Sequence, residues 1–114
     1  MKAGYKVWLD NRGKAFGDGP YELLRRVDET QSLHRAAKEM GMAYSKAWRL
    51  IGAMEKRLGF PLIERQVGGL SGGGSRVTLR GKALMKRYKQ FQKAVNTSVE
   101  KIYRAHFENN KLFK

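Results

Sequence analysis

The sequence predicts a mainly α-helical protein with small β hairpins and a long C-terminal helix. Two short segments, 32–40 and 44–58, have helical spacing of apolar residues and are separated by a turn that begins with Gly41. Two β-prone segments flank a glycine-rich stretch within 62–79. From about residue 80 to 107 the helical spacing is sustained.

Length and composition indicate one folded, strongly basic domain. The chain has 114 residues, with 24 Lys+Arg against 10 Asp+Glu and a net charge of +14. Hydrophobic residues make up 41% of the chain, which argues against a disordered polycation. A positive charge of this size favours a polyanionic partner, nucleic acid first and an acidic membrane surface second.

The positive charge is unevenly distributed. Residues 1–31 carry six Lys/Arg and five Asp/Glu, so they are nearly neutral. Residues 32–81 carry nine and three, and residues 82–114 carry nine and two. The basic field therefore belongs to the part of the chain after the first third.

Several classes of function are disfavoured. The absence of cysteine excludes disulfides, thiolate metal sites and a cysteine nucleophile. His34 and His106 are the only histidines, and no motif supplies further ligands, so we expect no metal, no cofactor and no enzymatic activity. There is no apolar leader and no run of about 18 apolar residues, so a cytoplasmic location is expected.

The N-terminal segment predicts a hairpin followed by a helix. Residues 5–9 alternate like a short strand, 10–13 form a turn, and 14–16 return as a second strand. Pro20 suits the first turn of a helix that ends near Gln31. Its buried face is either Tyr21, Leu24 and Val27 or Leu23 and Val27. Trp8 and Trp48 are expected in the core rather than as stacking platforms.

The next two predicted helices form a helix-turn-helix. Ser32 is a good N-cap for the first, and Gly41 ends it. The second has apolar positions every three or four residues at Ala47, Ile51, Met54 and Leu58. Its opposite face carries Ser45, Lys46 and Arg49 in the first turns, where recognition helices meet base edges. Spacing alone equally allows two ordinary helices with a solvated basic face.

A wing is predicted after the second helix. Residues 62–65 and 76–79 read as strands, with Thr78 able to cap the next helix. The segment 68–75 between them holds five of the 13 glycines. A phosphate-binding loop is disfavoured because Gly74 stands where that motif needs lysine. The alternatives are a flexible hairpin tip or a wing that places Arg76 on a phosphate strand, and the net charge favours the wing.

The C-terminal helix is longer than a domain of this size can cover. About 28 residues would extend about 42 Å, against a domain diameter of roughly 28 Å. Its apolar stripe is Leu84, Tyr88, Phe91, Val95 and Ile102, and Ser98 interrupts it. The stripe packs either on its own domain or on a second copy, and the length favours a homodimer.

The order of these elements resembles a known family. The residues Ser32-Leu33-His34-Arg35-Ala36-Ala37, Glu55 to Arg65 and Leu79-Arg80-Gly81 resemble the winged helix-turn-helix of LysR-type regulators. The segments Tyr44-Ser45-Lys46-Ala47-Trp48 and 64–74 are more similar to the N-terminal domain of the ModE family of molybdate-responsive regulators. The similarity covers nearly the whole chain, and in the family the long helix pairs two protomers.

The resemblance implies a homodimeric, sequence-specific DNA-binding transcriptional regulator on an inverted-repeat site in double-stranded DNA. Residues 1–80 would form the winged helix-turn-helix domain and 81–114 the dimerisation helix. Because the sequence stops at Lys114 without molybdate-binding domains, no molybdate site is expected in this chain. The expected DNA-binding residues are Ser32, Arg35, Lys38, Tyr44, Ser45, Lys46, Arg49, Arg65, Ser71, Ser75 and Arg76. The alternatives are an architectural, weakly specific nucleic-acid binder and a protein-interaction module.

Overall fold

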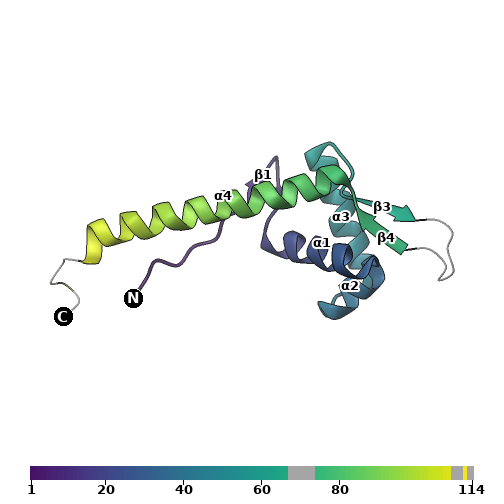
Figure 1. Ribbon diagram of the computed structural model, residues 1–114, viewed down its shortest axis with the longest axis horizontal. Coiled ribbons are helices and arrows are strands. Elements are labelled where there is room, and N and C mark those ends of the chain that lie inside the picture. The colour runs from purple at the N-terminus through teal and green to yellow at the C-terminus, as the bar shows by residue number, and fades with distance from the viewer. Residues whose placement is uncertain (67–73, 109–111, 113–114) are drawn as a thin grey trace.

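The computed structural model describes residues 1–66, 74–108 and 112 and shows an elongated molecule. It measures 64 × 27 × 21 Å along its principal axes, and its radius of gyration is 18.0 Å. A compact chain of this length would have a radius of gyration of about 13 Å. The difference arises because one long helix projects from a globular head of three helices and two hairpins (Figure 1).

The fold confirms the predicted class and order of elements. In chain order the strands and helices are β1 (Leu9–Asp10), β2 (Lys14–Phe16), α1 (Asp18–Thr30), α2 (Leu33–Glu39), α3 (Tyr44–Leu58), β3 (Ile63–Gln66), β4 (Gly74–Val77), α4 (Leu79–Tyr103) and a π-helical turn η1 (Arg104–Glu108). The strands form two separate antiparallel hairpins, β1–β2 and β3–β4. In the part of the chain that the structure describes, no helix is both long and apolar enough to cross a bilayer.

The N-terminal hairpin is shorter than expected. Strand β1 begins at Leu9 rather than at Tyr5, because its partner β2 has only three residues with which to pair. The indole of Trp8 consequently lies outside the core and is 50% exposed. The hairpin is tied to the end of α3 by hydrogen bonds from the Asn11 amide to the Arg57 carbonyl oxygen and from the Arg57 guanidinium to the Lys14 carbonyl oxygen.

Helices α2 and α3 meet at a tight turn whose geometry follows from Gly41. The Met42 N–H donates to the Ala37 carbonyl and the Gly41 N–H donates to the Lys38 carbonyl. This pattern, a Schellman motif, needs a left-handed residue after the helix end, and Gly41 has a φ of 67°. At the other end of α2, the Ser32 hydroxyl accepts the Arg35 N–H as predicted. Both boundaries of α2 were therefore predictable from local capping residues.

The core joins all the helices of the head. Ala36, Ala37 and Ala47 are each at most 1% exposed, and their small side chains let α2 and α3 approach closely. Leu24 and Val27 of α1 complete this contact, both at 0% exposure. Since Leu23 is buried as well and Tyr21 only half-buried, both proposed faces of α1 contribute to the core.

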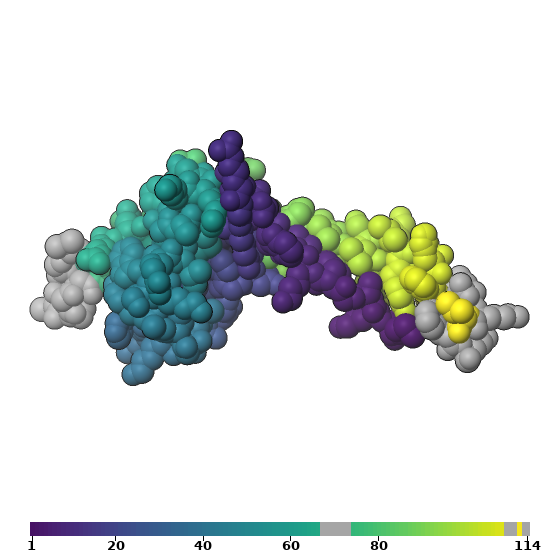
Figure 2. All heavy atoms as spheres, turned by 180° about the vertical axis from the view of Figure 1, so that it is seen from behind, coloured from purple at the N-terminus to yellow at the C-terminus, as the bar shows by residue number. Residues whose placement is uncertain are grey.

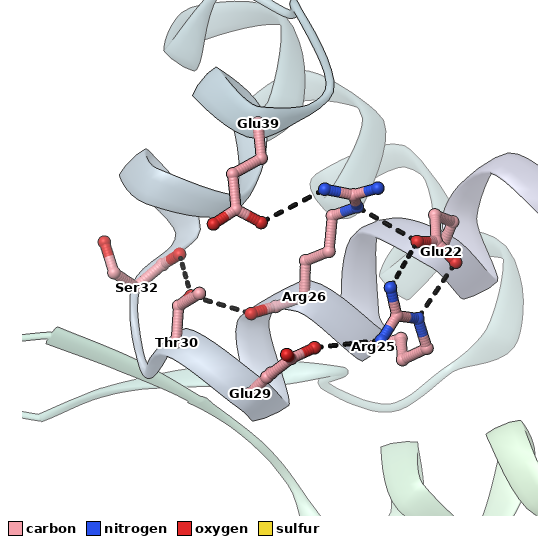
Figure 3. A network of polar contacts seen from close by, with 7 residues as sticks. All are labelled: Glu22, Arg25, Arg26, Glu29, Thr30, Ser32 and Glu39. Atoms are coloured by element: carbon pink, nitrogen blue, oxygen red, sulfur yellow. Dashed lines mark hydrogen bonds and ion pairs between the residues drawn. The ribbon is translucent and has the colours of Figure 1, made fainter.

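A network of charged residues fixes α1 against α2 (Figure 3). The guanidinium of Arg26 contacts Glu22 one turn earlier on α1 and Glu39 on α2, at 3.0 and 3.1 Å. The hydroxyl of Thr30 reaches the Arg26 carbonyl within α1 and the Ser32 carbonyl before α2. The pKa of Glu22 falls to about 2, first because Arg25 donates hydrogen bonds to its carboxylate. These contacts fix α2 relative to α1, and they thereby fix the direction in which the exposed residues of α2 face.

The wing hairpin pairs Ile63 with Val77 and Arg65 with Ser75. Strand β4 begins at Gly74, two residues earlier than predicted, and Leu79 is the first residue of α4 rather than the end of a strand. The predicted cap at Thr78 is confirmed, because its hydroxyl accepts the Gly81 N–H.

Helix α4 divides into a packed and a projecting part. Its buried residues are Gly81, Met85 and Tyr88, so no residue of α4 beyond Tyr88 is buried. A Cβ on Gly81 would lie 2.8 Å from the Leu62 carbonyl oxygen, so glycine permits the close approach of α4 to the wing. The projecting part runs beside the N-terminal segment (Figure 1).

Tyr88 occupies a different place from the one expected. The sequence placed it in a dimer stripe, but its ring is 1% exposed and packs edge-on against Phe16 at 5.2 Å. Its hydroxyl lies 2.8 Å from the Asp18 carboxylate and 3.1 Å from the Val7 carbonyl. Burial and this carboxylate raise the pKa of Tyr88 to about 12, and the same hydrogen bond lowers the pKa of Asp18. Tyr88 thus belongs to the chain's own core.

Candidate nucleic-acid interface

The exposed face of α3 carries the residues predicted to read bases. Ala47, Ile51 and Met54 are buried on one side of the helix, at 3% exposure or less. Ser45 and Arg49 point the other way and are exposed, as the 3.6-residue period requires. Lys46 is exposed beside them. The first turns of α3 therefore present two cations and a hydroxyl to solvent.

The N-terminus of α3 is open. Its N-cap is Ala43, which makes no side-chain capping hydrogen bond, whereas Ser32 caps α2. No capping side chain therefore accepts from the backbone N–H groups of the first turn of α3, which lie next to Lys46. A helix start of this kind attracts anions through its free N–H groups and its dipole. The Ser32 hydroxyl accepts the Arg35 N–H, and its own proton is the donor that could reach a phosphate.

Basic side chains fall into two groups according to their partners. Ion pairs among the described residues involve Arg25, Arg26, Arg76, Lys82 and Arg104. The other five cations predicted to bind DNA form none of these pairs: Arg35, Lys38, Lys46, Arg49 and Arg65. Uncompensated like charges repel one another in the free protein and favour binding of a polyanion.

The wing separates two arginines that the sequence treated alike. Arg76 contacts Glu64 across the hairpin at 2.8 Å, so its charge is already compensated. Arg65 lies on the other face of the hairpin, because successive strand residues alternate. Ser75 is only 8% exposed, which leaves its side chain little access to a phosphate, unlike the expectation. Ser71 lies outside the described residues.

An aromatic row that the sequence analysis missed borders this face. The His34 ring on α2 lies 5.2 Å from the Tyr44 ring, and Tyr44 lies edge-on to Trp48 at 6.2 Å. The Arg65 guanidinium lies over the Trp48 indole, 4.9 Å from its centroid. Trp48 was expected in the core. It is half-buried and packs against the core, and its ring also supports the Arg65 guanidinium. The period-4 spacing of Tyr44 and Trp48 on one helix was the available signal.

The projecting part of α4 carries what remains of the predicted dimer stripe. Phe91 and Ile102 are 44% and 59% exposed, Val95 is half-buried, and Leu84 packs partly on the core. A groove of about 1050 Å³ runs between residues 1–7 and the neighbouring face of α4 and η1. Figure 2 shows the N-terminal segment, in purple, lying along the yellow end of the helix. No three metal-ligating side chains gather anywhere in residues 1–66, 74–108 and 112.

Comparison with known proteins identifies the family. A family described as "Bacterial regulatory helix-turn-helix protein, lysR family" matches residues 21–82, which run from α1 to the first turn of α4. The chain belongs to this family. The matched segment contains every residue of the α3 face and of the wing described above.

Individual relatives match 58–79% of this lysR-family chain. A protein named molybdenum transport protein ModE from Azotobacter vinelandii is 29% identical over 79% of the chain and 33% of its own length. Molybdenum-pterin-binding protein MopB from Rhodobacter capsulatus is 34% identical over 72% of the chain and 30% of its own length. Transcriptional regulator ModE from Haemophilus influenzae is 36% identical over 58% of the chain and 26% of its own length. The chain spans about a third of the length of these relatives or less.

Proposed function

We propose that this chain is a sequence-specific DNA-binding transcriptional regulator that acts as a homodimer. The observation that carries the proposal is the exposed face of α3, whose cations Lys46 and Arg49 form no ion pair with any described residue. It stands next to an open helix N-terminus in a domain of net charge +14. The name of the Haemophilus influenzae relative, a transcriptional regulator, supports the same assignment.

Recognition would proceed through α3 in the major groove. Arg49 would fork to a guanine edge, with Ser45 and Lys46 on neighbouring bases, because recognition helices read bases through their first turns. Arg35, Lys38 and the Ser32 proton on α2 would hold phosphates, as would Arg65 on β3. Tyr44, 37% exposed at the start of α3, would contact the backbone or a thymine methyl. Arg76 would contribute less, since it must first leave Glu64.

A homodimer would cover the projecting part of α4. Phe91 and Ile102 form an exposed apolar strip there, and a monomer has no element that could bury it within residues 1–66 and 74–108. Two-fold pairing through this strip would present two copies of α3 on one side of DNA. The half-sites would then lie about one helical turn apart or a multiple of it, in inverted orientation.

The deciding experiment is selection of bound sites from a random DNA pool at a stated salt concentration. We expect an inverted repeat to be enriched, and we expect binding to resist excess random DNA. If an equal mass of random DNA abolished binding to the selected site, the result would favour the alternative, an architectural binder of low specificity. Absence of any salt-dependent DNA binding would leave only the interaction-module alternative.

A further inference from the structure

We propose that Trp48 is a positioning residue that holds the Arg65 guanidinium against a DNA phosphate, so that the recognition helix and the wing bind as one unit. The inference rests on the proposed function, and it assigns a role to a contact between α3 and β3 that base reading does not require.

The first step is the position of Arg65 on the hairpin. Residues alternate between the two faces of a strand, so Arg65 shares a face with Ile63. Ile63 is 8% exposed, as is Ser75, the cross-strand neighbour of Arg65. The Arg65 side chain extends beyond these two buried residues. It is exposed, and its guanidinium lies over the indole of Trp48.

The second step is the chemistry of the contact. A guanidinium over the face of an indole is attracted by the ring quadrupole, and this contact uses none of its N–H donors as a salt bridge would. Such an arginine can stack and bind a phosphate in a bidentate manner at the same time. No carboxylate of the described residues forms an ion pair with Arg65, in contrast to Arg76, which Glu64 engages.

The third step is the continuity of the row. Trp48 is held in turn by Tyr44, whose ring contacts His34 on α2. The row therefore connects α2, α3 and β3. Without an indole in the middle, the flexible arginine would adopt many rotamers, and binding would require ordering it.

The test measures DNA affinity against salt for four variants. The probe is a fluorescently labelled random-sequence duplex, titrated at NaCl concentrations from about 50 to 200 mM. The slope of log K against log salt falls by about 0.9 for each lost phosphate contact. We expect this loss for Arg65→Gln, for Trp48→Leu and for the double variant, with no further loss in the double. Trp48→Phe, which keeps an aromatic face, should retain the slope of the unmodified protein.

A matched control is Tyr21→Leu, which removes the ring under Lys89 on the far side of the core, where the nitrogen lies 4.5 Å from the centroid. Like Trp48→Leu, it removes apolar contacts of an aromatic ring, but it should leave the slope of log K against log salt unchanged. If Trp48→Leu does not fold, Trp48→Met keeps more apolar volume and tests the same loss of the platform.

Two results would overturn the inference. A Trp48→Leu or Trp48→Met variant that binds more weakly with an unchanged slope would show a structural role only. Losses that add in the double variant would show that the two residues act independently. If the unmodified protein shows no salt-dependent binding, the proposed function fails, and the inference fails with it.

Discussion

The carboxylate of Glu55 on α3 accepts the backbone N–H of Leu62, with an N···O distance of 2.6 Å. The same oxygen accepts the N–H of Ile63 at 3.3 Å. One side chain from the last turns of α3 thus holds the first residues of the wing. The orientation of the wing relative to α3 is therefore fixed at two points, by the hydrogen bonds to Glu55 and by the cation–π contact of Arg65 with Trp48.

Replacing Glu55 by alanine should destabilise the fold. The change leaves two backbone donors without their acceptor beside Leu62, which is 0% exposed. We expect a loss of about 1–3 kcal/mol in the free energy of unfolding, measured by urea denaturation. Glu64→Ala is the control, since it removes only an exposed ion pair with Arg76 worth about 0–1 kcal/mol. Equal effects of the two variants would contradict this account of Glu55.

Arg49 should contribute to sequence preference. Arg49→Ala is expected to weaken binding to the selected site by about 1–3 kcal/mol and to relax the preference at one base position. Its guanidinium is exposed and has no partner in the described residues, so the fold should lose little stability. The measurement is the affinity for the selected site and for random DNA. An equal loss on both would reassign Arg49 to a phosphate.

Much of this interface could be predicted because its determinants are local. Ser32, Gly41 and Gly59 act as caps, so they fix both ends of α2 and the C-terminal end of α3 without reference to the rest of the chain. The exposed face of α3 then follows from the period of its buried residues, here Ile51 and Ala47.

The remainder depends on contacts between distant segments. Tyr88 and Phe91 are three residues apart on α4, and only the packing of Phe16 and Tyr21 decides that the first is core and the second is not. The contact of Arg65 with Trp48 joins two elements, so no periodicity within either one predicts it. The π-helical turn at 104–108 has no sequence signal that we recognise.

Gly52 offers a test of how closely α3 approaches DNA. It lies within α3 three residues after Arg49, so the two are neighbours on the helix surface, and a Cβ there would meet no atom within 4 Å. Gly52→Ala should therefore stabilise the free protein by about 0.5–1 kcal/mol, since glycine is unfavourable inside a helix. It should weaken DNA binding if α3 fits tightly into the groove. Gly19→Ala on α1, also with open space, should stabilise without affecting binding. Equal DNA affinities would place Gly52 away from the duplex.

The pair of Asp18 and Tyr88 should make stability depend on pH at both ends of the range. The pKa of Asp18 is lowered in the fold, so its contribution is present above about pH 4 and is lost as the pH falls below that value. The pKa of Tyr88 is raised from 10.0 to about 12, so its contribution is lost as the pH rises through that interval. In urea denaturation, the free energy of unfolding should fall less above pH 10 for Tyr88→Phe than for the unmodified protein. The difference between the two losses should reach roughly 2–3 kcal/mol. Parallel profiles for the two proteins would refute this linkage.

Phe91 should decide whether two copies associate. Phe91→Asp places a charge on the exposed strip of α4 that a partner would cover, and burying an unpaired carboxylate costs several kcal/mol. Because Phe91 is 44% exposed in the single chain, helical content should remain. We expect monomers in sedimentation and loss of the inverted-repeat preference. Thr97→Asp, on the far side of the helix and also exposed, should remain dimeric. A Phe91→Asp protein that stays dimeric on the same repeat would show that the dimer forms through another surface.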